Sequence, residues 1–134
     1  MKVTGHCFCG AIAFSGEIDP SRVRVCHCTD CQRQTGTAFR TNVNTLPGTF
    51  ALLKGAPKHF VKTADSGRQR VNGFCPDCGS PIYSTEPGPA PETYALRVGT
   101  LDQKAELLPS VQLWTHSALP WAMDITGVDR RERQ

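Results

Sequence analysis

Seven cysteines stand out in this chain of 134 residues because they fall into three short groups. In chain order the groups are Cys7 and Cys9, then Cys26, Cys28 and Cys31, and finally Cys75 and Cys78. We call the first and last groups together the outer cysteines, and the middle group the triplet. Thiolates are soft ligands that suit zinc, and two close pairs separated by a long insert commonly form one closed tetrahedral site. The outer cysteines therefore predict a structural zinc that ties the start of the chain to its middle.

The triplet offers one ligand fewer than a tetrahedral zinc requires. Its thiols recur at i, i+2 and i+5, so they can face one centre at a corner between a strand and a turn. Three protein ligands with an open fourth position are typical of catalytic zinc, where the open position takes a water or a substrate atom such as a thiolate. We therefore expect a second, catalytic zinc on Cys26, Cys28 and Cys31. Two alternatives stay open: water or His27 completes a second structural site, or part of the triplet is simply buried.

The setting of the cysteines favours a reducing compartment. Their odd number is inconsistent with a fully paired disulfide framework, and reducing compartments use thiols for metals or catalysis. Residues 1–6 lack the apolar core of a signal peptide, and no window approaches the roughly 20 apolar residues of a membrane span. We expect a cytoplasmic protein without a membrane partner. The net charge of +3 is small and evenly spread, so a nucleic-acid partner is not favoured.

The chain that positions these thiols is expected to be mainly β. Only 7% of the residues are aromatic, and 12 glycines and 10 prolines divide the chain, a composition that favours short antiparallel strands with very little helix. Apolar or alternating segments predict strands at residues 11–16, 23–26, 38–43, 50–53, 60–61, 81–84, 93–99 and 112–114. Residues 64–68 are predicted to form a turn. The length fits one zinc-binding domain over residues 1–128, followed by a charged tail at 129–134.

The triplet is expected to lie between a strand and a short helix. Residues 23–26 deliver Cys26 from a strand, and residues 30–36 predict one helical turn that Gly36 ends. Asp30 is interpreted as the cap of this helix. Neighbouring side chains on an extended segment point to opposite sides, so His27 is expected to lie outside the set of metal ligands.

Four arginines and two tryptophans are candidates for shaping a substrate site. The arginines, which could hold the carboxylates of an acidic substrate, are Arg24, Arg33, Arg40 and Arg97. For any single one of them, a solvated strand face is the simpler interpretation. Trp114 and Trp121, with Phe39, could wall a pocket near the triplet, although packing in the core is the simpler expectation for large aromatic side chains.

Four motifs give the chain a resemblance to a known family. They are GHCFCG at residues 5–10, CHCTDC at 26–31, FCPDCG at 74–79 and GTLD at 99–102. In these motifs the sequence resembles the glutathione-dependent formaldehyde-activating enzyme family, which also includes centromere protein V. Residues 113–114 and 120–121 resemble the closing segment of that family. Gln32 and Gln112 depart from it, because an arginine and a histidine are expected at these positions.

This resemblance implies a fold and an activity. The fold is a β-rich, tent-like zinc fold, with a structural zinc on the outer cysteines and a second zinc on the triplet. The activity is the condensation of formaldehyde with glutathione to S-hydroxymethylglutathione, in which the second zinc binds the glutathione sulfur as a thiolate. The expected function is therefore that of a zinc-dependent carbon–sulfur lyase or synthase acting on a small thiol adduct. The alternative is a non-catalytic zinc scaffold that binds a protein or nucleic-acid partner.

Overall fold

The computed structural model describes residues 1–64 and 66–134, and within them the chain is mainly β with a single α-helix. The strands are β1 (Lys2–His6), β2 (Ala13–Glu17), β3 (Arg24–Cys26), β4 (Arg40–Asn44), β5 (Ala51–Lys54), β6 (Lys58–Thr63), β7 (Gln69–Phe74), β8 (Pro81–Thr85), β9 (Ala95–Arg97) and β10 (Val111–Leu113). The helix is α1 (Thr29–Thr35), and short 3-10 helices are η1 (Pro20–Arg22), η2 (Val98–Thr100), η3 (Lys104–Glu106), η4 (Thr115–Ser117) and η5 (Pro120–Met123). The predicted mainly β class is confirmed. The turn predicted at 64–68 includes residue 65, which lies outside the described residues.

Two sheets carry these strands. One has three strands in the order β1-β2-β5, and the other has seven in the order β10-β3-β4-β9-β8-β7-β6. The described pairs are antiparallel except that of β10 with β3, which runs parallel and places Leu113 opposite Cys26. Parallel neighbours require a long connection, and here residues 27–110, which include α1 and β4 to β9, separate β3 from β10. This parallel pair brings the C-terminal part of the chain beside the triplet.

The first strand, β1, is one that the sequence patterns above do not predict. It pairs with β2 along its whole length, and its Val3 side chain is buried. At Gly5 an added Cβ atom would lie 2.6 Å from both the Phe14 ring and the Thr100 carbonyl oxygen, so this close approach requires glycine. The position of β1 therefore depends on close packing at Gly5 and not on a hydrophobic pattern. Cys7 follows directly after this strand.

The hydrophobic core draws side chains from both sheets. Its fully buried members include Phe14, Ile12, Ile18, Ile82 and Leu96. Phe50 stacks on Tyr94 with ring centroids 4.0 Å apart. The thiols of Cys7 and Cys75 belong to the same buried cluster. Two of the outer cysteines, Cys7 and Cys75, are therefore anchored in the hydrophobic core.

The predicted strands differ from the observed ones mainly at their ends. The segment predicted at 38–43 becomes β4 at Arg40–Asn44. The strand predicted at 93–99 shortens to β9, because the chain turns into η2 and the Thr100 hydroxyl donates to the Arg97 carbonyl oxygen at 2.8 Å. Helix α1 ends at Thr35 with Gly36 in the left-handed conformation at φ 67°, which confirms the predicted helix stop.

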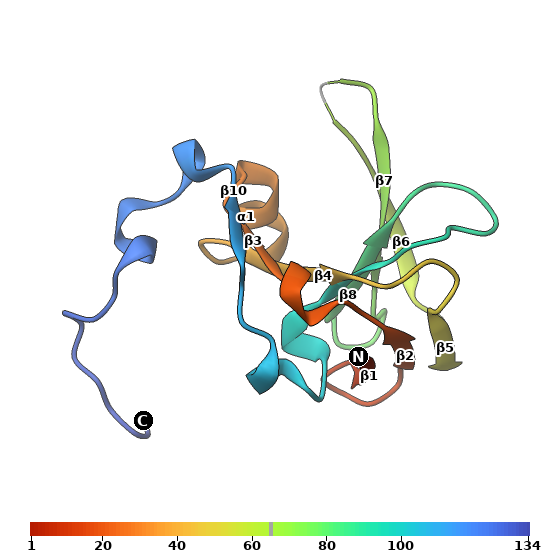
Figure 1. The fold of residues 1–134 in the computed structure, drawn as a ribbon, viewed down its shortest axis with the longest axis horizontal. Helices are drawn as coiled ribbons and strands as arrows, with labels where there is room; N and C mark the ends of the chain where they lie inside the picture. The colour runs from red at the N-terminus through yellow and green to blue at the C-terminus, as the bar shows by residue number, and fades with distance from the viewer. Residues whose placement is uncertain (65) are drawn as a thin grey trace.

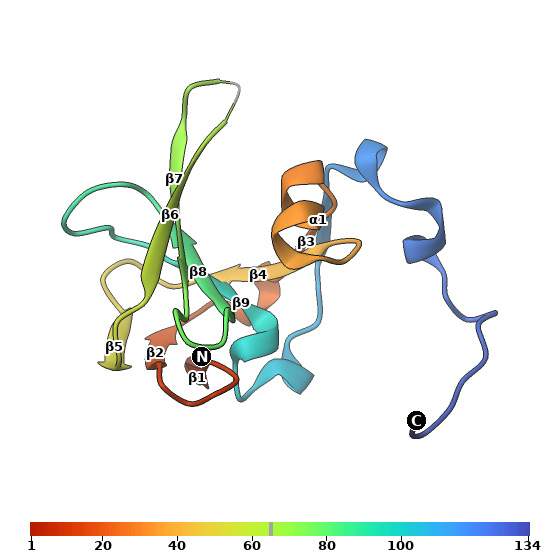
Figure 2. The same cartoon turned by 180° about the vertical axis from the view of Figure 1, so that it is seen from behind.

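The arrangement of the elements leaves α1 exposed on one side of the large sheet. Figure 2 shows α1 beside one end of β4, while β6 and β7, which belong to the far edge of the same sheet, extend upward beyond its other end. The chain after β10 passes beside α1 and then extends away from both sheets (Figure 1). Within residues 1–64 and 66–134, no helix is long and apolar enough to cross a membrane.

Candidate metal centres and the cleft beside them

The outer cysteines come together where two tight turns meet. One turn joins β1 to β2 and the other joins β7 to β8, and all four sulfur atoms lie within 4.8 Å of one another. The sulfur atoms of Cys7 and Cys9 are 3.5 Å apart, and those of Cys9 and Cys75 are 3.8 Å apart. A tetrahedral zinc with Zn–S bonds of about 2.3 Å places its ligand atoms about 3.8 Å from one another. The four thiols therefore fit one closed zinc site.

Glycine and backbone N–H groups shape both turns in the same way. Gly10 and Gly79 adopt the left-handed conformation, with φ of 73° and 74°, and each N–H donates to the carbonyl oxygen of the first cysteine in its turn. The Ile12 N–H donates to the Cys7 sulfur at 3.2 Å. Burial by itself raises the pKa of Cys7, but this hydrogen bond and those with neighbouring thiols outweigh burial, so the pKa is lowered. The turn thus favours the thiolate form of Cys7, which is the form that a metal requires.

The triplet lies at the corner where β3 leads into α1. Cys26 ends β3, Cys28 is the N-cap of α1, and Cys31 lies in the first turn of the helix, with all three sulfur atoms within 4.8 Å. The Cys28 sulfur accepts the Cys31 N–H at 3.4 Å. Among residues 1–64 and 66–134, no further Cys, His, Asp or Glu joins this group. The triplet can therefore offer a metal ion three protein ligands from one side.

Hydrogen bonding within the triplet favours one thiolate before any metal binds. A hydrogen bond from Cys31 lowers the pKa of Cys26 to about 5, and the positive charge of Arg40 acts in the same direction. The same hydrogen bond, together with burial, raises the pKa of Cys31. Arg40 lies directly opposite Cys26 in the β3–β4 register. A negative charge is therefore favoured at the triplet, which suits a divalent cation.

A cleft of about 1100 Å³ opens beside Cys28. Its walls come from α1, from β6 and from the chain after β10, and they include Thr29, Asp30, Arg33, Gln34, Phe60, Val61, Lys62, Thr63, Trp114, His116 and Ser117. Asp30 and Lys62 form an ion pair that joins α1 to β6. The rings of Trp114 and His116 are neighbours, with centroids 5.5 Å apart. The cleft thus combines a triplet thiol with charged, aromatic and imidazole side chains.

Gln32 fixes one wall of this cleft. Its side-chain amide donates to the carbonyl oxygen of His27 at 2.8 Å and to that of Ser117 at 2.9 Å. These two bonds join α1 to both the triplet corner and η4. Gln32, which departs from the expected arginine, therefore holds the segment that carries His116 against the helix.

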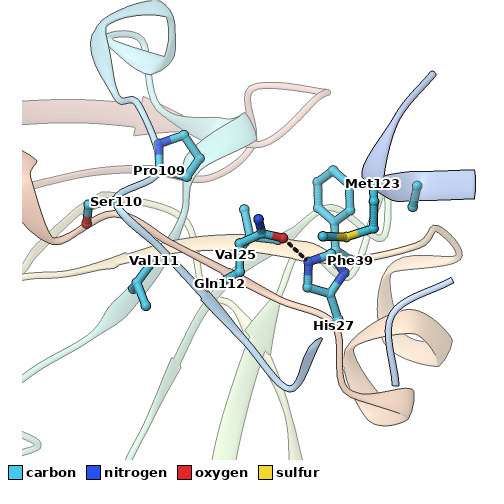
Figure 3. Close-up of a pocket in the computed structure, with 9 residues that line it drawn as sticks. Val25, His27, Phe39, Pro109, Ser110, Val111, Gln112 and Met123 are labelled. Atoms are coloured by element: carbon cyan, nitrogen blue, oxygen red, sulfur yellow. Dashed lines mark hydrogen bonds between the residues drawn. The ribbon is translucent and has the colours of Figure 1, made fainter. Parts of the chain in front are cut away.

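His27 points away from the triplet, in agreement with the alternation of an extended segment. Its side chain is 1% exposed, and its Nε2 atom lies 2.8 Å from Gln112 Oε1. Figure 3 shows the imidazole beside Phe39 and Met123, at the edge of a second pocket of about 600 Å³. His27 and the three cysteines do not form one ligand set among the described residues. Gln112, the second departure from the family pattern, therefore orients a histidine that lies behind the candidate metal site.

Two expectations about side chains near the triplet are wrong. Asp30 does not cap α1, because the Cys28 sulfur occupies the capping position and the Asp30 carboxylate pairs with Lys62 instead. Trp114 and Trp121 do not pack in the core, since they are 59% and 61% exposed. β10 is an edge strand of the large sheet, and the chain after it leads away from both sheets (Figure 1), so neither indole lies between the sheets. Trp114 lines the cleft.

The four candidate arginines occupy different environments. Arg33 is exposed and lines the cleft, whereas Arg24 is half-buried and donates to Asn44 on the neighbouring strand. Arg40 and Arg97 are 8% and 5% exposed, so a solvated strand face is the wrong interpretation for both. They line a separate pocket of about 330 Å³. Burial and the nearby charge of Arg40 lower the pKa of Arg97 to about 9.

Sequence patterns do not mark Gln34, Lys62 and His116 as site residues. They come from α1, β6 and η4, which lie far apart in the chain and meet at the cleft. None of them has a spacing that indicates a ligand or a catalytic group. The pairing of β10 with β3, which the sequence does not reveal, is what brings η4 to the triplet.

Comparison with known proteins adds a family and a fold. Residues 2–117 match the family model described as glutathione-dependent formaldehyde-activating enzyme. The fold is similar to that in a crystal structure of a Rhodobacter sphaeroides protein, with a TM-score of 0.61 and 20% identity over 81% of this chain and 98% of that chain. At this identity the likeness concerns the fold alone. No curated protein matches the sequence.

Proposed function

The chain belongs to the glutathione-dependent formaldehyde-activating enzyme family, and on that premise we propose that it joins formaldehyde to the sulfur of a small thiol. The reaction takes place in the cleft beside the triplet, and glutathione is the first candidate thiol. A C–S bond forms between the thiol sulfur and the aldehyde carbon, while the thiol proton passes to the aldehyde oxygen. The product is an S-hydroxymethyl thiol, and no oxidant or reductant is consumed. The same site catalyses the reverse reaction, cleavage of the adduct.

The observation that carries this proposal is the position of the triplet at the edge of the cleft. Three sulfur atoms within 4.8 Å can hold a metal ion from one side, and Cys28 lines a cavity of about 1100 Å³. A zinc ion held by the triplet would supply a Lewis acid that keeps a thiol sulfur in the thiolate form near neutral pH. Small-molecule sites commonly have volumes of about 300–1000 Å³. The cleft therefore has room for a tripeptide thiol.

The side chains of the cleft can bind the substrate and move its proton. Arg33 places positive charge on one wall, which favours an anionic thiol such as glutathione, whereas the charge of Lys62 is balanced by Asp30. Phe60 and Trp114 contribute apolar surface that displaces water from the position of the new bond. An imidazole can exchange protons near neutral pH, so we assign to His116 the transfer of a proton to the aldehyde oxygen.

Exchange spectroscopy by NMR, on mixtures of glutathione and formaldehyde, tests the proposal with the zinc-loaded protein. We expect exchange between glutathione and its S-hydroxymethyl adduct to be faster than in buffer. Cys28→Ala is expected to remove this gain, and Arg24→Gln, which lies outside the cleft, is expected to keep it. The absence of any rate gain with the zinc-loaded wild type would refute the glutathione reaction.

The alternative of a non-catalytic zinc scaffold is less well supported. A fourth protein ligand on the triplet would favour it, and none joins the triplet among residues 1–64 and 66–134. The net charge of +3 is too small to favour a nucleic-acid partner by itself. An enzyme that uses reduced thiol ligands and a thiol substrate fits the cytoplasm, which we propose as its location.

A further inference from the structure

Arg40 and Arg97 form a pair of buried cations in a pocket between the two groups of cysteines. Their exposed fractions are 8% and 5%, so each side chain is more than nine-tenths buried. The pocket, of about 330 Å³, reaches from Gln34 of α1 to Gly79 in the turn of the outer cysteines. It spans neighbouring strands of the large sheet, from β4 across to β6.

The hydrogen bonds of the two guanidinium groups go to neutral acceptors. Arg40 Nη2 donates to Gln34 Oε1 at 2.6 Å. Arg97 Nη1 donates to Asn42 Oδ1 and to the Ala95 carbonyl oxygen, and Arg97 Nη2 donates to Asn72 Oδ1 at 3.0 Å. Each bond fixes the direction of a guanidinium group, but none of them neutralises its charge.

Several donors in this pocket lack an acceptor. The Nε atoms of Arg40 and Arg97 and the Nδ2 atom of Asn72 are buried without a hydrogen-bond partner. Within residues 1–64 and 66–134, no carboxylate forms an ion pair with either arginine. The great majority of buried donors in proteins have a hydrogen-bond acceptor. Three buried donors without one in a single pocket therefore point to a missing acceptor.

The triplet thiols, when ionised, attract Arg40 and Arg97, but among the described residues neither buried cation has a carboxylate partner. Burying a charge without a partner is strongly unfavourable, and the mutual repulsion of the two guanidinium groups adds to the cost. A neutral side chain would make the same bonds to Gln34 or Asn42 without this cost. Binding of an anion would offset this cost, because the anion accepts hydrogen bonds from the donors and also balances the positive charge.

We propose that this pocket binds a carboxylate group between Arg40 and Arg97. The other walls are largely apolar and aromatic, from Phe60, Phe74 and Tyr83. Such walls strengthen a charge-assisted hydrogen bond because they exclude water. The ligand class is therefore a carboxylate attached to an apolar or flat group.

The pocket is continuous with the cleft beside the triplet. Gln34 and Phe60 line both cavities. A thiol substrate with its sulfur near Cys28 can therefore extend past Gln34 and place a carboxylate on the arginines. This link to the thiol substrate rests on the proposed function, whereas the carboxylate site itself does not.

Phenylacetate is the probe that tests the carboxylate site without any turnover. In NMR titrations of the zinc-loaded protein, we expect saturable shifts of the Nε–H signals of Arg40 and Arg97. Phenylacetamide, which has the same ring but no charge, is expected to leave these signals unchanged. The proposal is overturned if phenylacetate gives no saturable shift, or if the neutral amide binds equally well.

Variants of Arg97 provide the second part of the test. Arg97→Gln is expected to weaken phenylacetate binding at least tenfold, while Arg24→Gln, outside both cavities, is expected to bind like the wild type. Arg97→Lys keeps the charge but loses the fork of donors, so an intermediate affinity is expected. This variant also serves if Arg97→Gln does not fold. Equal affinity in Arg97→Lys and wild type would contradict a site that depends on the guanidinium group.

The outcome can be separated from that of the proposed function. If glutathione and formaldehyde give no rate gain but phenylacetate binding depends on the arginines, the carboxylate site stands and the reaction is wrong. If the reaction is catalysed, Arg97→Lys is expected to raise the KM for glutathione severalfold with little change in kcat. Catalysis by Arg97→Lys with an unchanged KM, together with no binding of phenylacetate to the wild type, would support the proposed reaction and refute the carboxylate site.

Discussion

The outer cysteines and the triplet use the same ligand atom, but the chain presents it to them in different ways. The outer cysteines come from two turns separated by a long insert, and two of their thiols, those of Cys7 and Cys75, are fully buried in the core. The triplet comes from a single corner of six residues, and Cys28 faces a cleft. Two turns that meet can surround an ion, whereas one corner reaches it from one side only. The number of segments at a site therefore separates a closed centre from an open one.

The surroundings of the two groups of cysteines also differ, and they too suggest a structural role for the outer cysteines and a chemical role for the triplet. The outer cysteines pack against the hydrophobic core, where binding a metal cross-links two hairpins. The triplet is bordered by charged residues and an imidazole, which have no use in a purely structural site. The comparison predicts that damage to the outer cysteines affects folding and that damage around the triplet affects activity.

The largest effect is expected from Cys75→Ala. Structural zinc contributes about 10–16 kcal/mol of apparent binding energy in zinc-finger peptides, which is far more than a small domain can lose. We expect Cys75→Ala to abolish the cooperative thermal transition seen by circular dichroism. Cys28→Ala is the matched control and is expected to keep that transition. A folded Cys75→Ala protein would break the distinction between the two groups.

Cys28→Ala is expected to have the next largest effect, on activity. Its zinc content should fall from two ions per chain to one, because two thiols at the triplet hold zinc poorly. The rate gain with glutathione and formaldehyde should fall by at least about 10³-fold, since the Lewis acid lowers the barrier by several kcal/mol. Metal analysis by mass spectrometry and exchange spectroscopy provide the two measurements. An unchanged zinc content would show that the triplet does not bind the second ion.

His116→Gln tests whether the cleft carries out proton transfer. General acid–base groups contribute about 10²–10⁴-fold, so we expect kcat to fall at least about 10²-fold with little change in KM. Gln keeps a similar size and can hydrogen-bond, but it cannot exchange a proton near neutral pH. The pH profile of kcat should differ between His116→Gln and the wild type. An unaltered profile would assign the proton transfer to another group.

Trp114→Ala is expected to have a smaller effect, on substrate binding. Trp114 lines the cleft, and Trp121 has nearly the same exposure but does not line it, with exposed fractions of 59% and 61%. We expect Trp114→Ala to raise KM about tenfold, because an aromatic contact of this kind contributes about 1 kcal/mol or slightly more. Trp121→Ala should leave KM unchanged. Equal effects in steady-state kinetics would mean that the cleft wall does not contact the substrate.

Two glycine substitutions provide the finest comparison. Gly79 and Gly36 have φ of 74° and 67°, and an added Cβ would meet no atom within 4 Å at either position. Alanine should therefore cost a similar 1–2 kcal/mol at both sites, from the left-handed backbone alone. Chemical denaturation measures this cost, and competition with a zinc chelator should show weaker binding of the outer zinc only in Gly79→Ala. Weaker binding of that zinc in Gly36→Ala would show that the two centres are coupled.

The sequence predicted the features that depend on neighbouring residues. Three features follow from local spacing, and the structure agrees with each. They are the grouping of the cysteines, the glycine that ends α1 and the orientation of His27 away from the triplet. Metal-binding turns and helix ends are determined within a few residues, so a linear pattern is sufficient to reveal them. Zinc at either site, the catalytic use of the triplet and a single domain over residues 1–128 stay predictions.

Other features depended on segments that are distant in the chain. Strand β1 forms because Gly5 fits against Phe14 and Thr100, and the parallel pairing of β10 with β3 brings His116 and Trp114 to the triplet. The sequence could not show that Asp30 pairs with Lys62, because that choice depends on where β6 lies.

The sequence by itself therefore determined which thiols belong together, and the tertiary structure decided what each group faces. Cys26, Cys28 and Cys31 are close because six residues connect them, whatever the rest of the chain does. The cleft beside them, and the burial of Arg40 and Arg97 without a carboxylate among the described residues, exist because separate strands and helices pack around these side chains. Burial and electrostatic surroundings are properties of long-range packing, and no local pattern encodes them.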